Sequence, residues 1–201
     1  FMSVLGWIVI VIGGSIHVGD RIRVEKDGSI YIGDVLDISM LRITIHEDIT
    51  LTSYMTNRRA GRIIFIPYIF TMMIANYTHG GMRTVWDGID FSITFDSNYQ
   101  KAVKIATEVA IKYSKGYTQV TKKQLRKMRD KYSLRNSNTE PRTYSFIEPN
   151  GIKISVWYQT NSYATLSLRS TISLEIMQLI LKEPDIFIAY DTTKFVQTPN
   201  D

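Results

Sequence analysis

The sequence of 201 residues contains no cysteine. Disulfide bonds and thiolate metal sites are therefore excluded. Histidine is also scarce: His17, His46 and His79 lie far apart, and none has a second histidine at the spacing of a metal site. The patterns of zinc proteases, phosphate-binding loops and nucleophile elbows are missing as well. We therefore expect no enzyme and no cofactor or metal.

One short stretch invites a metal interpretation. Residues 44–48, TIHED, place His46 beside Glu47 and Asp48. A single histidine next to two acids is more often part of a polar edge or turn after a strand, and we favour that interpretation. The metal site stays the weaker alternative.

A long hydrophobic run is absent too. Residues 1–14 are almost wholly apolar, but a helix that crosses a membrane needs about 20 such residues. No basic residues precede the run, so it does not resemble a secretory signal. The β-branched residues from Ile8 to Ile12 favour a buried strand. The alternative is the end of a membrane helix that begins upstream of Phe1.

The remaining composition is globular, with an excess of positive charge. The sequence is 44% hydrophobic and 21% charged, which is enough apolar material for a core without covalent cross-links. Lys and Arg number 24 against 19 Asp and Glu, so the formal net charge is +5. This balance suits nucleic acid, anionic lipid headgroups or anions in a vestibule, and it does not choose among them.

The first half of the sequence has the pattern of short β-strands. Residues 21–35 alternate between apolar and polar on both sides of Asp27-Gly28, which is a strong signal for a β-hairpin. Gly33-Asp34 predicts a bend before the next strand. Further strands are expected at 35–45, 49–54 and 62–66, with a polar turn at 57–61 and an end at Pro67. So many short strands predict a small barrel or sandwich.

The second half mixes strands and helices after a hinge or linker at 78–82. A helix is expected from the capping residues 96–98 to about Lys115, with Gly116 as its stop. The other predicted elements are strands at 85–95, 143–147, 152–158 and 186–189, helices at 121–132 and 164–182, a loop at 136–141, and a lone terminal strand at 192–196. This order is β-α-β-β-α-β with an inserted helix, which is typical of the ferredoxin-like α/β fold.

Two features leave their function open. The basic segment 121–135 includes Lys122, Lys123, Arg126 and Lys127. It suits phosphates, headgroups or permeating anions, but we favour a solvated helix face docked on the sheet. Tyr144, Phe146, Trp157 and Tyr158 are typical of a nucleic-acid stacking platform, but alternating aromatic residues on strands are more often core. The basic-glycine-aromatic string of RNA-recognition sheets is absent.

The order of these pieces resembles the small-conductance mechanosensitive channel family, the MscS-like channels. The apolar run leads to VGDRIRV, the hairpin, GDVLDISMLRITI, RIIFIP, IANYT and a strand that ends in FDSN. Each string is weak alone, but their order and spacing are specific. In two places the sequence departs from the family: Tyr68, not asparagine, follows Pro67, and the segment 47–57 is longer than in the shortest members.

The resemblance implies an α+β fold class with four parts. Residues 1–14 would be the end of a pore-lining transmembrane helix, 15–78 a small all-β (SH3/Sm-like) barrel, 79–190 a ferredoxin-like α/β domain, and 191–201 a C-terminal barrel strand with a tail. The implied site residues are Trp7, Gly13 and Gly14 at the pore-helix end and hinge; Gly19, Asp20, Gly33, Pro67 and Asn76 in the β-domain; and Thr192, Thr193, Lys194, Phe195 and Val196 in the C-terminal barrel.

The resemblance also implies a function. The chain would belong to a homoheptamer in a bacterial inner membrane, with its partners being further copies of itself, the lipid bilayer, and permeating ions and small solutes. Membrane tension would open the channel on hypo-osmotic shock. Lys122, Lys123, Arg126 and Lys127 would be vestibule cations, and no nucleic acid is expected. The alternative is a soluble β-barrel and ferredoxin-like module that binds RNA or anionic lipid.

Overall fold

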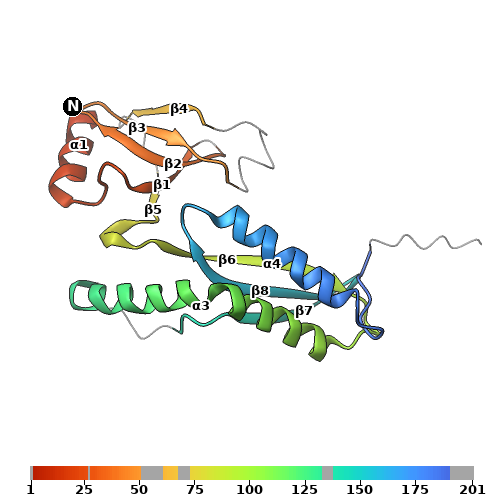
Figure 1. Cartoon of the computed structure of the whole chain (residues 1–201). Coiled ribbons are helices and arrows are strands. Elements are labelled where there is room, and N and C mark those ends of the chain that lie inside the picture. Colours follow the sequence, from red (N-terminus) through yellow and green to blue (C-terminus); the bar gives the residue numbers. More distant parts are fainter. Residues whose placement is uncertain (1, 27, 51–60, 68–72, 133–137, 191–201) are drawn as a thin grey trace, which may run out of the picture.

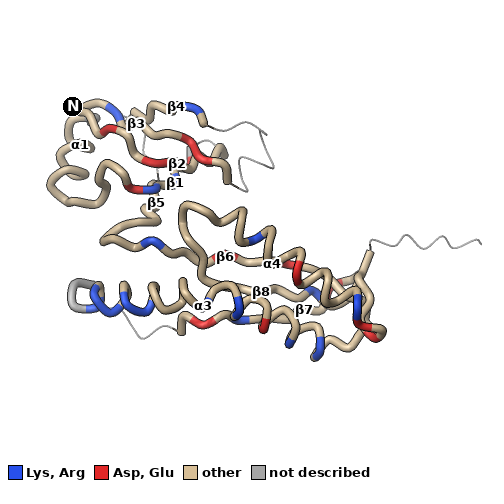
Figure 2. The backbone as a smooth tube through the Cα atoms, in the orientation of Figure 1, with Lys and Arg blue, Asp and Glu red and all other residues tan. Residues whose placement is uncertain are grey.

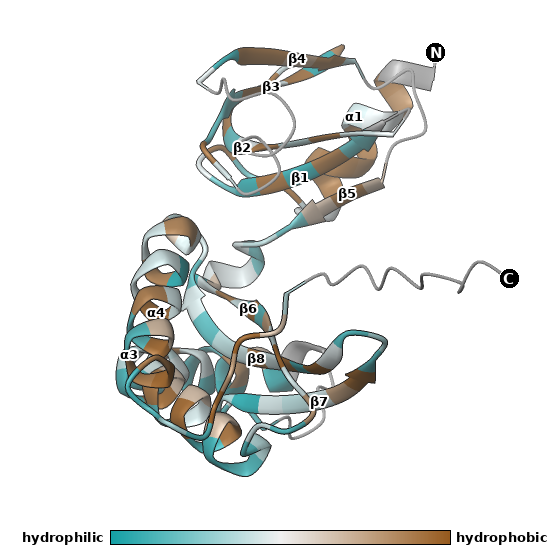
Figure 3. Ribbon diagram, turned by 90° about the vertical axis from the view of Figure 1, so that its right-hand side faces the viewer, coloured by the Kyte–Doolittle hydropathy of each residue, from teal (hydrophilic) through white to brown (hydrophobic). Residues whose placement is uncertain are grey.

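A computed structural model of the chain describes residues 2–26, 28–50, 61–67, 73–132 and 138–190, and it places two separate sheets one above the other (Figure 1). The first sheet follows a short helix, α1. The second sheet carries two long helices on one side (Figure 3). The fold is thus α+β, as the sequence predicts.

The first sheet has five strands in the order β4-β3-β2-β1-β5, and each pair is antiparallel. Its elements are α1 (Met2–Gly13), β1 (Arg21–Lys26), β2 (Ser29–Ile38), β3 (Arg42–Glu47), β4 (Ile63–Pro67) and β5 (Met73–Asn76). The buried core consists of Ile16, Ile22, Val24, Val35, Ile43, Ile45 and Ile66, with Ile10 of α1 packed against it. The apolar positions that alternate in the sequence therefore meet on one face.

The prediction of a buried strand near the N-terminus is wrong, because these residues form the helix α1. A helix satisfies its own backbone hydrogen bonds, whereas a strand needs a neighbour, and β-branched residues disfavour a helix only weakly. Gly14 has φ +56°, and this left-handed residue ends the helix. Among the described residues, no helix is long and apolar enough to cross a membrane.

The predicted hairpin is confirmed, but the bend after it is wrong. Lys26 pairs with Ser29 across the two-residue turn, and Gly28 has φ +76°. Gly33 and Asp34 lie inside β2, which runs on to Ile38 before the chain turns into β3. The predicted strand at 35–45 is therefore two strands. Gly33 serves close packing, because a Cβ atom there would lie 2.3 Å from the His46 carbonyl oxygen.

The second sheet has the strand order β6-β8-β7. Its elements are the short 3-10 turn η1 (His79–Gly81), β6 (Thr84–Ile93), α3 (Tyr99–Tyr132), β7 (Arg142–Glu148), β8 (Gly151–Asn161) and α4 (Thr165–Ile180). The predicted strand at 186–189 is reduced to one bridge, Ile93 to Ile188, beside β6. With that segment, the order is the ferredoxin-like one that the sequence predicts.

Helix α3 corrects a second prediction. The expected stop at Gly116 and the expected separate helix at 121–132 are both wrong, because α3 is continuous over 34 residues. Gly116 is not among the glycines with positive φ, so it does not end the helix. Buried Ser114, Thr118 and Thr121 continue the inner face beyond the apolar residues Ala106 and Ala110. The helix therefore stays docked after its apolar stripe ends.

Several predicted elements fall on residues outside the described ranges. The terminal strand 192–196 lies wholly outside them, as do most of the strand 49–54 and of the turn 57–61. The predicted helix at 164–182 and the hairpin of 143–147 with 152–158 are confirmed, with ends shifted by a few residues.

Two glycines give opposite predictions for stability. Gly33→Ala should lower the free energy of unfolding by about 1–3 kcal/mol, because the new methyl group must displace the backbone of β3. Gly116→Ala should raise it by about 0.5–1 kcal/mol, because the site is helical with open space around it. Urea unfolding followed by circular dichroism measures both. A destabilised Gly116→Ala variant would contradict the continuous helix.

Candidate functional site at the junction of the two sheets

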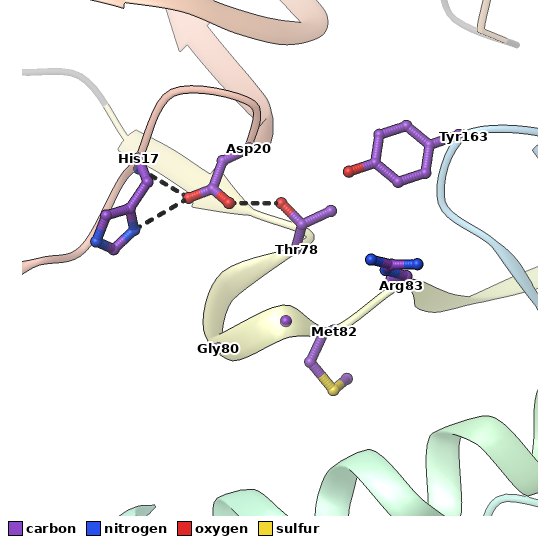
Figure 4. A pocket seen from close by; sticks show the side chains of 8 residues that line it. His17, Asp20, Thr78, Gly80, Met82, Arg83 and Tyr163 are labelled. Carbon is purple, nitrogen blue, oxygen red and sulfur yellow. Dashed lines mark hydrogen bonds and ion pairs between the residues drawn. The ribbon is translucent and has the colours of Figure 1, made fainter.

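Asp20 gathers the chain around the start of β1. Its Oδ2 accepts hydrogen bonds from the His17 backbone N–H at 2.8 Å and the Asn76 side chain at 2.7 Å. Its Oδ1 accepts one from the Thr78 hydroxyl at 3.0 Å (Figure 4). Asp20 and Asn76, two family-motif positions that are 56 residues apart in the sequence, thus meet in one place.

Asn76 joins the segment after α1 to the end of the first sheet. Its amide also donates to the Ser15 carbonyl at 2.9 Å, and its Oδ1 accepts from the Thr78 N–H at 2.9 Å. Gly19, at φ +88°, donates its N–H to the Val35 carbonyl at 2.8 Å. A side chain at this left-handed position would be strained, which explains the glycine there. The helix exit is therefore fastened to both β2 and β5.

The ionised form of Asp20 is the stable one. Partial burial raises the pKa of its carboxyl, but hydrogen bonds from His17, Asn76 and Thr78, together with the charge of His17, outweigh burial and lower that pKa below its ordinary value. The His17 Nδ1 lies 3.7 Å from Oδ2. Donors from three segments therefore hold one carboxylate.

Arg21 links the two sheets. Its side chain is buried, and its guanidinium binds Asp34 through two bonds of 2.8 and 2.9 Å and pairs with Asp48. It also donates to the Ser162 carbonyl at 3.0 Å and lies 4.6 Å from the Tyr163 ring centre. Burial alone would lower the pKa of Arg21, but the carboxylates of Asp34 and Asp48 outweigh burial and raise that pKa above its ordinary value, so the residue stays charged. Ser162 and Tyr163 belong to the β8–α4 loop of the second sheet.

The far end of α3 supports the linker between the sheets. Gln124 donates to the Gly81 carbonyl at 2.8 Å, and a Cβ atom on Gly80 would lie 3.3 Å from the Met128 methyl carbon. The buried hydroxyls of Thr84 and Thr121 lie 2.6 Å apart. The linker therefore packs on the part of α3 that extends beyond Gly116.

A cleft of about 340 Å³ opens at this junction (Figure 4). It is lined by His17, Asp20, Thr78, Gly80, Gly81, Met82, Arg83 and Tyr163. The polar side chains of its wall are one histidine, one aspartate, one threonine, one arginine and one tyrosine, so a single carboxylate and a single imidazole face it beside a guanidinium, which does not favour a metal cation. In the part of the chain that the structure describes, no three histidine or acidic side chains group to hold a metal.

The TIHED stretch is not a turn. Thr44, His46 and Glu47 belong to β3, an inner strand of the first sheet. Glu47 is buried, and both its oxygens accept 2.7 Å bonds from Arg62. The prediction of a polar edge or turn is therefore wrong in position, and the acid is engaged in an ion pair.

The predicted pore-helix residues lie at the edge of the first sheet. Trp7 is half-buried, while four apolar side chains of α1 are exposed: Leu5, Val9, Val11 and Ile12. Gly13 is the last helical residue, and Gly14 turns the chain toward Ser15. Of the remaining motif positions, Gly33 is in β2, and Pro67 is the last residue of β4, paired with Arg42.

The predicted cations lie on the far half of α3, where Lys and Arg gather (Figure 2). Lys122 pairs with Glu140, whereas Lys123, Arg126 and Lys127 are exposed and make no ion pair within the described ranges. Leu125 and Met128 are half-buried on the opposite side. The helix is therefore docked on one face and cationic on the other, as we expect from the sequence.

The aromatic residues divide between the two faces of the second sheet. Tyr158 is buried in the core, as expected, and burial followed by the Asp87 carboxylate raises the pKa of its hydroxyl. Tyr144, Phe146 and Trp157 are exposed on the other face, so the expectation that they are core residues is wrong.

The alternation of residues 21–35 does not single out Arg21, although its side chain is buried at the junction. The hairpin register contains the signal, because the turn at 27–28 sets Arg21 opposite Asp34. Thr78 is the last residue of the IANYT motif and the first of the predicted hinge at 78–82, and neither pattern indicates its hydrogen bond to Asp20. Nothing in the sequence alone marks Ser162 and Tyr163, because they join the site through tertiary contact.

Residues 1–79 match the family described as "Mechanosensitive ion channel, beta-domain". The resemblance to the MscS-like family is confirmed. The matched region holds Asp20 and Asn76, so the hydrogen-bonded cluster lies in the part of the chain that is similar to this β-domain. No curated protein sequence matches the chain.

Solved structures share the fold over nearly the whole chain. The crystal structure of closed-state MscS from Helicobacter pylori has a TM-score of 0.62 at 14% identity and covers 99% of this chain and 66% of its own. The cryo-EM structure of MSL1 from Arabidopsis thaliana has a TM-score of 0.53 at 14% identity and covers 95% and 58%. The A320V form of MSL1 gives 0.52 at 13%, with 95% and 60%. The chain thus spans about three fifths of the MSL1 chains and 66% of the MscS chain that it matches.

Asp20→Asn should destabilise the protein in a pH-dependent way. A folded-state pKa below the ordinary value of 3.8 stabilises the fold above that value, and this contribution is lost as the pH falls through the lower folded-state pKa. We therefore expect a loss of about 1–3 kcal/mol at pH 7, because an amide cannot accept all three hydrogen bonds, and a much smaller loss near pH 2.

Asp37→Asn is the matched control, because Asp37 lies on β2, is exposed and has no bonded partner among the described residues. Urea unfolding of both variants at the two pH values measures the effect. An equal loss in both variants would rule out the Asp20 cluster as its cause.

Proposed function

We propose that this chain is a subunit of a mechanosensitive ion channel that membrane tension opens, so that ions and small solutes leave the cell on hypo-osmotic shock. The single observation that carries the proposal is the family match of residues 1–79, which includes α1 and the whole first sheet. The shared fold of the second half supports it.

The proposal assigns a part of the channel to each segment. Residues 1–14 form the lower end of a pore-lining helix, 15–78 the β-domain, 79–190 the α/β domain and 191–201 a barrel strand completed by other copies. The exposed apolar side chains of α1 support this assignment, because an isolated chain leaves them in water at a cost of apolar exposure. Trp7, Gly13 and Gly14 then mark the point where the chain leaves the pore.

The proposal also assigns the partners. A homoheptamer in a cell membrane places the β-domain ring below the bilayer, with the two sheets on the cytoplasmic side. Tension favours the conformation of larger membrane area, so a two-state equilibrium shifts toward the open pore. In this scheme the chain forms the assembly ring and the vestibule and has no catalytic role.

Patch-clamp recording tests the proposal. The full parent protein is reconstituted in liposomes, and suction is applied to the patch. Discrete currents with an open probability that rises with suction, and that empty liposomes lack, are the expected result. A silent patch, with insertion and assembly verified, would overturn the channel function. RNA or anionic-lipid binding that weakens steeply with salt would then favour the soluble binding module.

The exposed cations of α3 should bias permeation toward anions. Removing two of them by Lys123→Gln/Lys127→Gln should lower the anion-to-cation permeability ratio by roughly two-fold, because a charged rim controls the local ion concentration. Lys122 is left unchanged because it holds Glu140. The reversal potential in asymmetric salt is the measurement.

Lys115→Gln/Lys182→Gln is the control for that experiment. It removes the same charge from exposed positions outside the segment 122–127, where neither lysine makes an ion pair within the described ranges. A shift of equal size in both variants would mean that net charge alone sets the preference. An unchanged reversal potential in the Lys123/Lys127 variant would exclude the vestibule role.

A further inference from the structure

One face of the second sheet carries large aromatic side chains in water. Trp86, Tyr144, Phe146 and Trp157 are each exposed by 41–52%, and we call these four the aromatic face. Trp157 alternates with the buried core residues Val156 and Tyr158, so it points away from the core. Figure 3 shows α3 and α4 together on the opposite side of the sheet.

The charges beside the aromatic face cancel. Lys153 of β8 lies 3.5 Å from both Asp90 and Glu148. Arg142 of β7, which pairs with Trp157, is the second cation on this face. This surface thus holds two cations and two carboxylates: Lys153 pairs with both acids, and Arg142 lies 5.9 Å from the Trp86 ring centre. A platform for nucleic acid needs a positive groove. A neutral patch rich in aromatic residues is the composition of a protein interface.

Helix α4 presents a second unusual surface. Its exposed positions contain no charged residue: Ser167, Ser170, Thr171, Leu174, Met177 and Gln178. The two charged residues of the helix are engaged inside the chain, because Arg169 binds Asp87 and the Gly88 carbonyl, and Glu175 binds Lys112 and Tyr113. A solvated helix face normally carries charge.

The exposed apolar residues of α4 form a stripe. Leu174, Met177 and Leu181 recur at i, i+3 and i+7, and they are exposed by 43–70%. The buried row of the helix, Ile172, Ile176 and Ile180, faces the sheet. The stripe therefore lies on the outside of the helix layer. It and the aromatic face occupy opposite outer surfaces of the same two-layer unit.

We propose that the α4 stripe of one copy packs on the aromatic face of the next copy. Two different patches on opposite surfaces make a heterologous, head-to-tail contact, which generates a ring when the rotation closes. This inference rests on the self-assembly in the proposed function and names the surfaces that carry it. The second copy is the occupant because neither patch offers charge to a polyanion or a headgroup.

The area of the patch sets its role in the ring. Four aromatic side chains of about 150–250 Å² each, exposed by nearly half, offer roughly 400 Å². A stable interface buries about 800 Å² per partner. The contact is therefore the apolar centre of a larger interface, to which other parts of the chain contribute the rest.

Cysteine cross-linking tests the proposal directly, because these 201 residues contain no cysteine. Tyr144→Cys or Phe146→Cys is combined with Leu174→Cys or Met177→Cys in the full parent protein, with any cysteine elsewhere replaced. A short bismaleimide then joins nearby thiols, and denaturing gels separate the products. We expect ladders of cross-linked chains for the double variants and a single band for each of the four single variants.

The design includes a control pair of cysteines, and native mass spectrometry measures the oligomeric state of the wild-type protein and the variants. Phe146→Cys/Lys123→Cys carries an equal number of exposed thiols and should give no ladder. Cross-linked dimers from the single variants would overturn the head-to-tail contact in favour of a symmetric one. An assembled protein with no ladder from any of the four double variants would overturn the inference alone. A monomeric wild-type protein would overturn the self-assembly in the proposed function as well.

Discussion

The buried guanidinium of Arg21 is the interaction on which the arrangement of the two sheets depends. Removing such a charge from water is costly, and two carboxylates, Asp34 and Asp48, compensate for it. A fourth contact runs from its Nη1 to the Ser162 carbonyl at 3.0 Å, and Tyr163 covers the plane of the guanidinium. Separating the two sheets would leave both carboxylates in place but would break the bond to Ser162 and the contact with Tyr163, and a hydrogen bond to a charged group contributes about 1.5–3 kcal/mol.

The neighbouring Asp20 cluster gives this fixed junction its connection to α1. The Ser15 carbonyl, just after the helix, accepts a bond from Asn76, and Asn76 in turn accepts one from the first residue of the linker, Thr78. The linker then lies on α3 through Gln124. The shortest route from the apolar helix to the second sheet therefore runs through hydrogen bonds at the junction and not across the first sheet.

Local patterns in the sequence were enough for the hairpin at 21–35, the helix after residue 164 and the strand order of the second half. They failed where tertiary contact decides. Residues 2–13 form a helix that satisfies its own backbone hydrogen bonds, and α3 continues through Gly116 because Thr121 and Gln124 still contact the rest of the chain beyond it. Arg21 alternates like a surface residue, yet it is buried, because its partners come from β2, from Asp48 and from a loop some 140 residues away. The residue order of the Asp20 motif was visible in the sequence, but its hydrogen bonds were not.

Periodicity tells which residues share a face, but it does not tell which faces are covered. The sequence of α3 is amphipathic, with charged residues on its outer side, and that side is exposed. The sequence of α4 has apolar residues on more than one side, and its exposed positions are uncharged. In a single chain, the row of Ile172, Ile176 and Ile180 is covered, whereas Leu174 and Met177 are exposed. Helix α4 and the aromatic strands thus share one property: each has more apolar surface than a single chain buries. In the proposed ring, one contact would satisfy both requirements, because the exposed apolar residues of the helix layer would meet the exposed aromatic residues of the sheet layer.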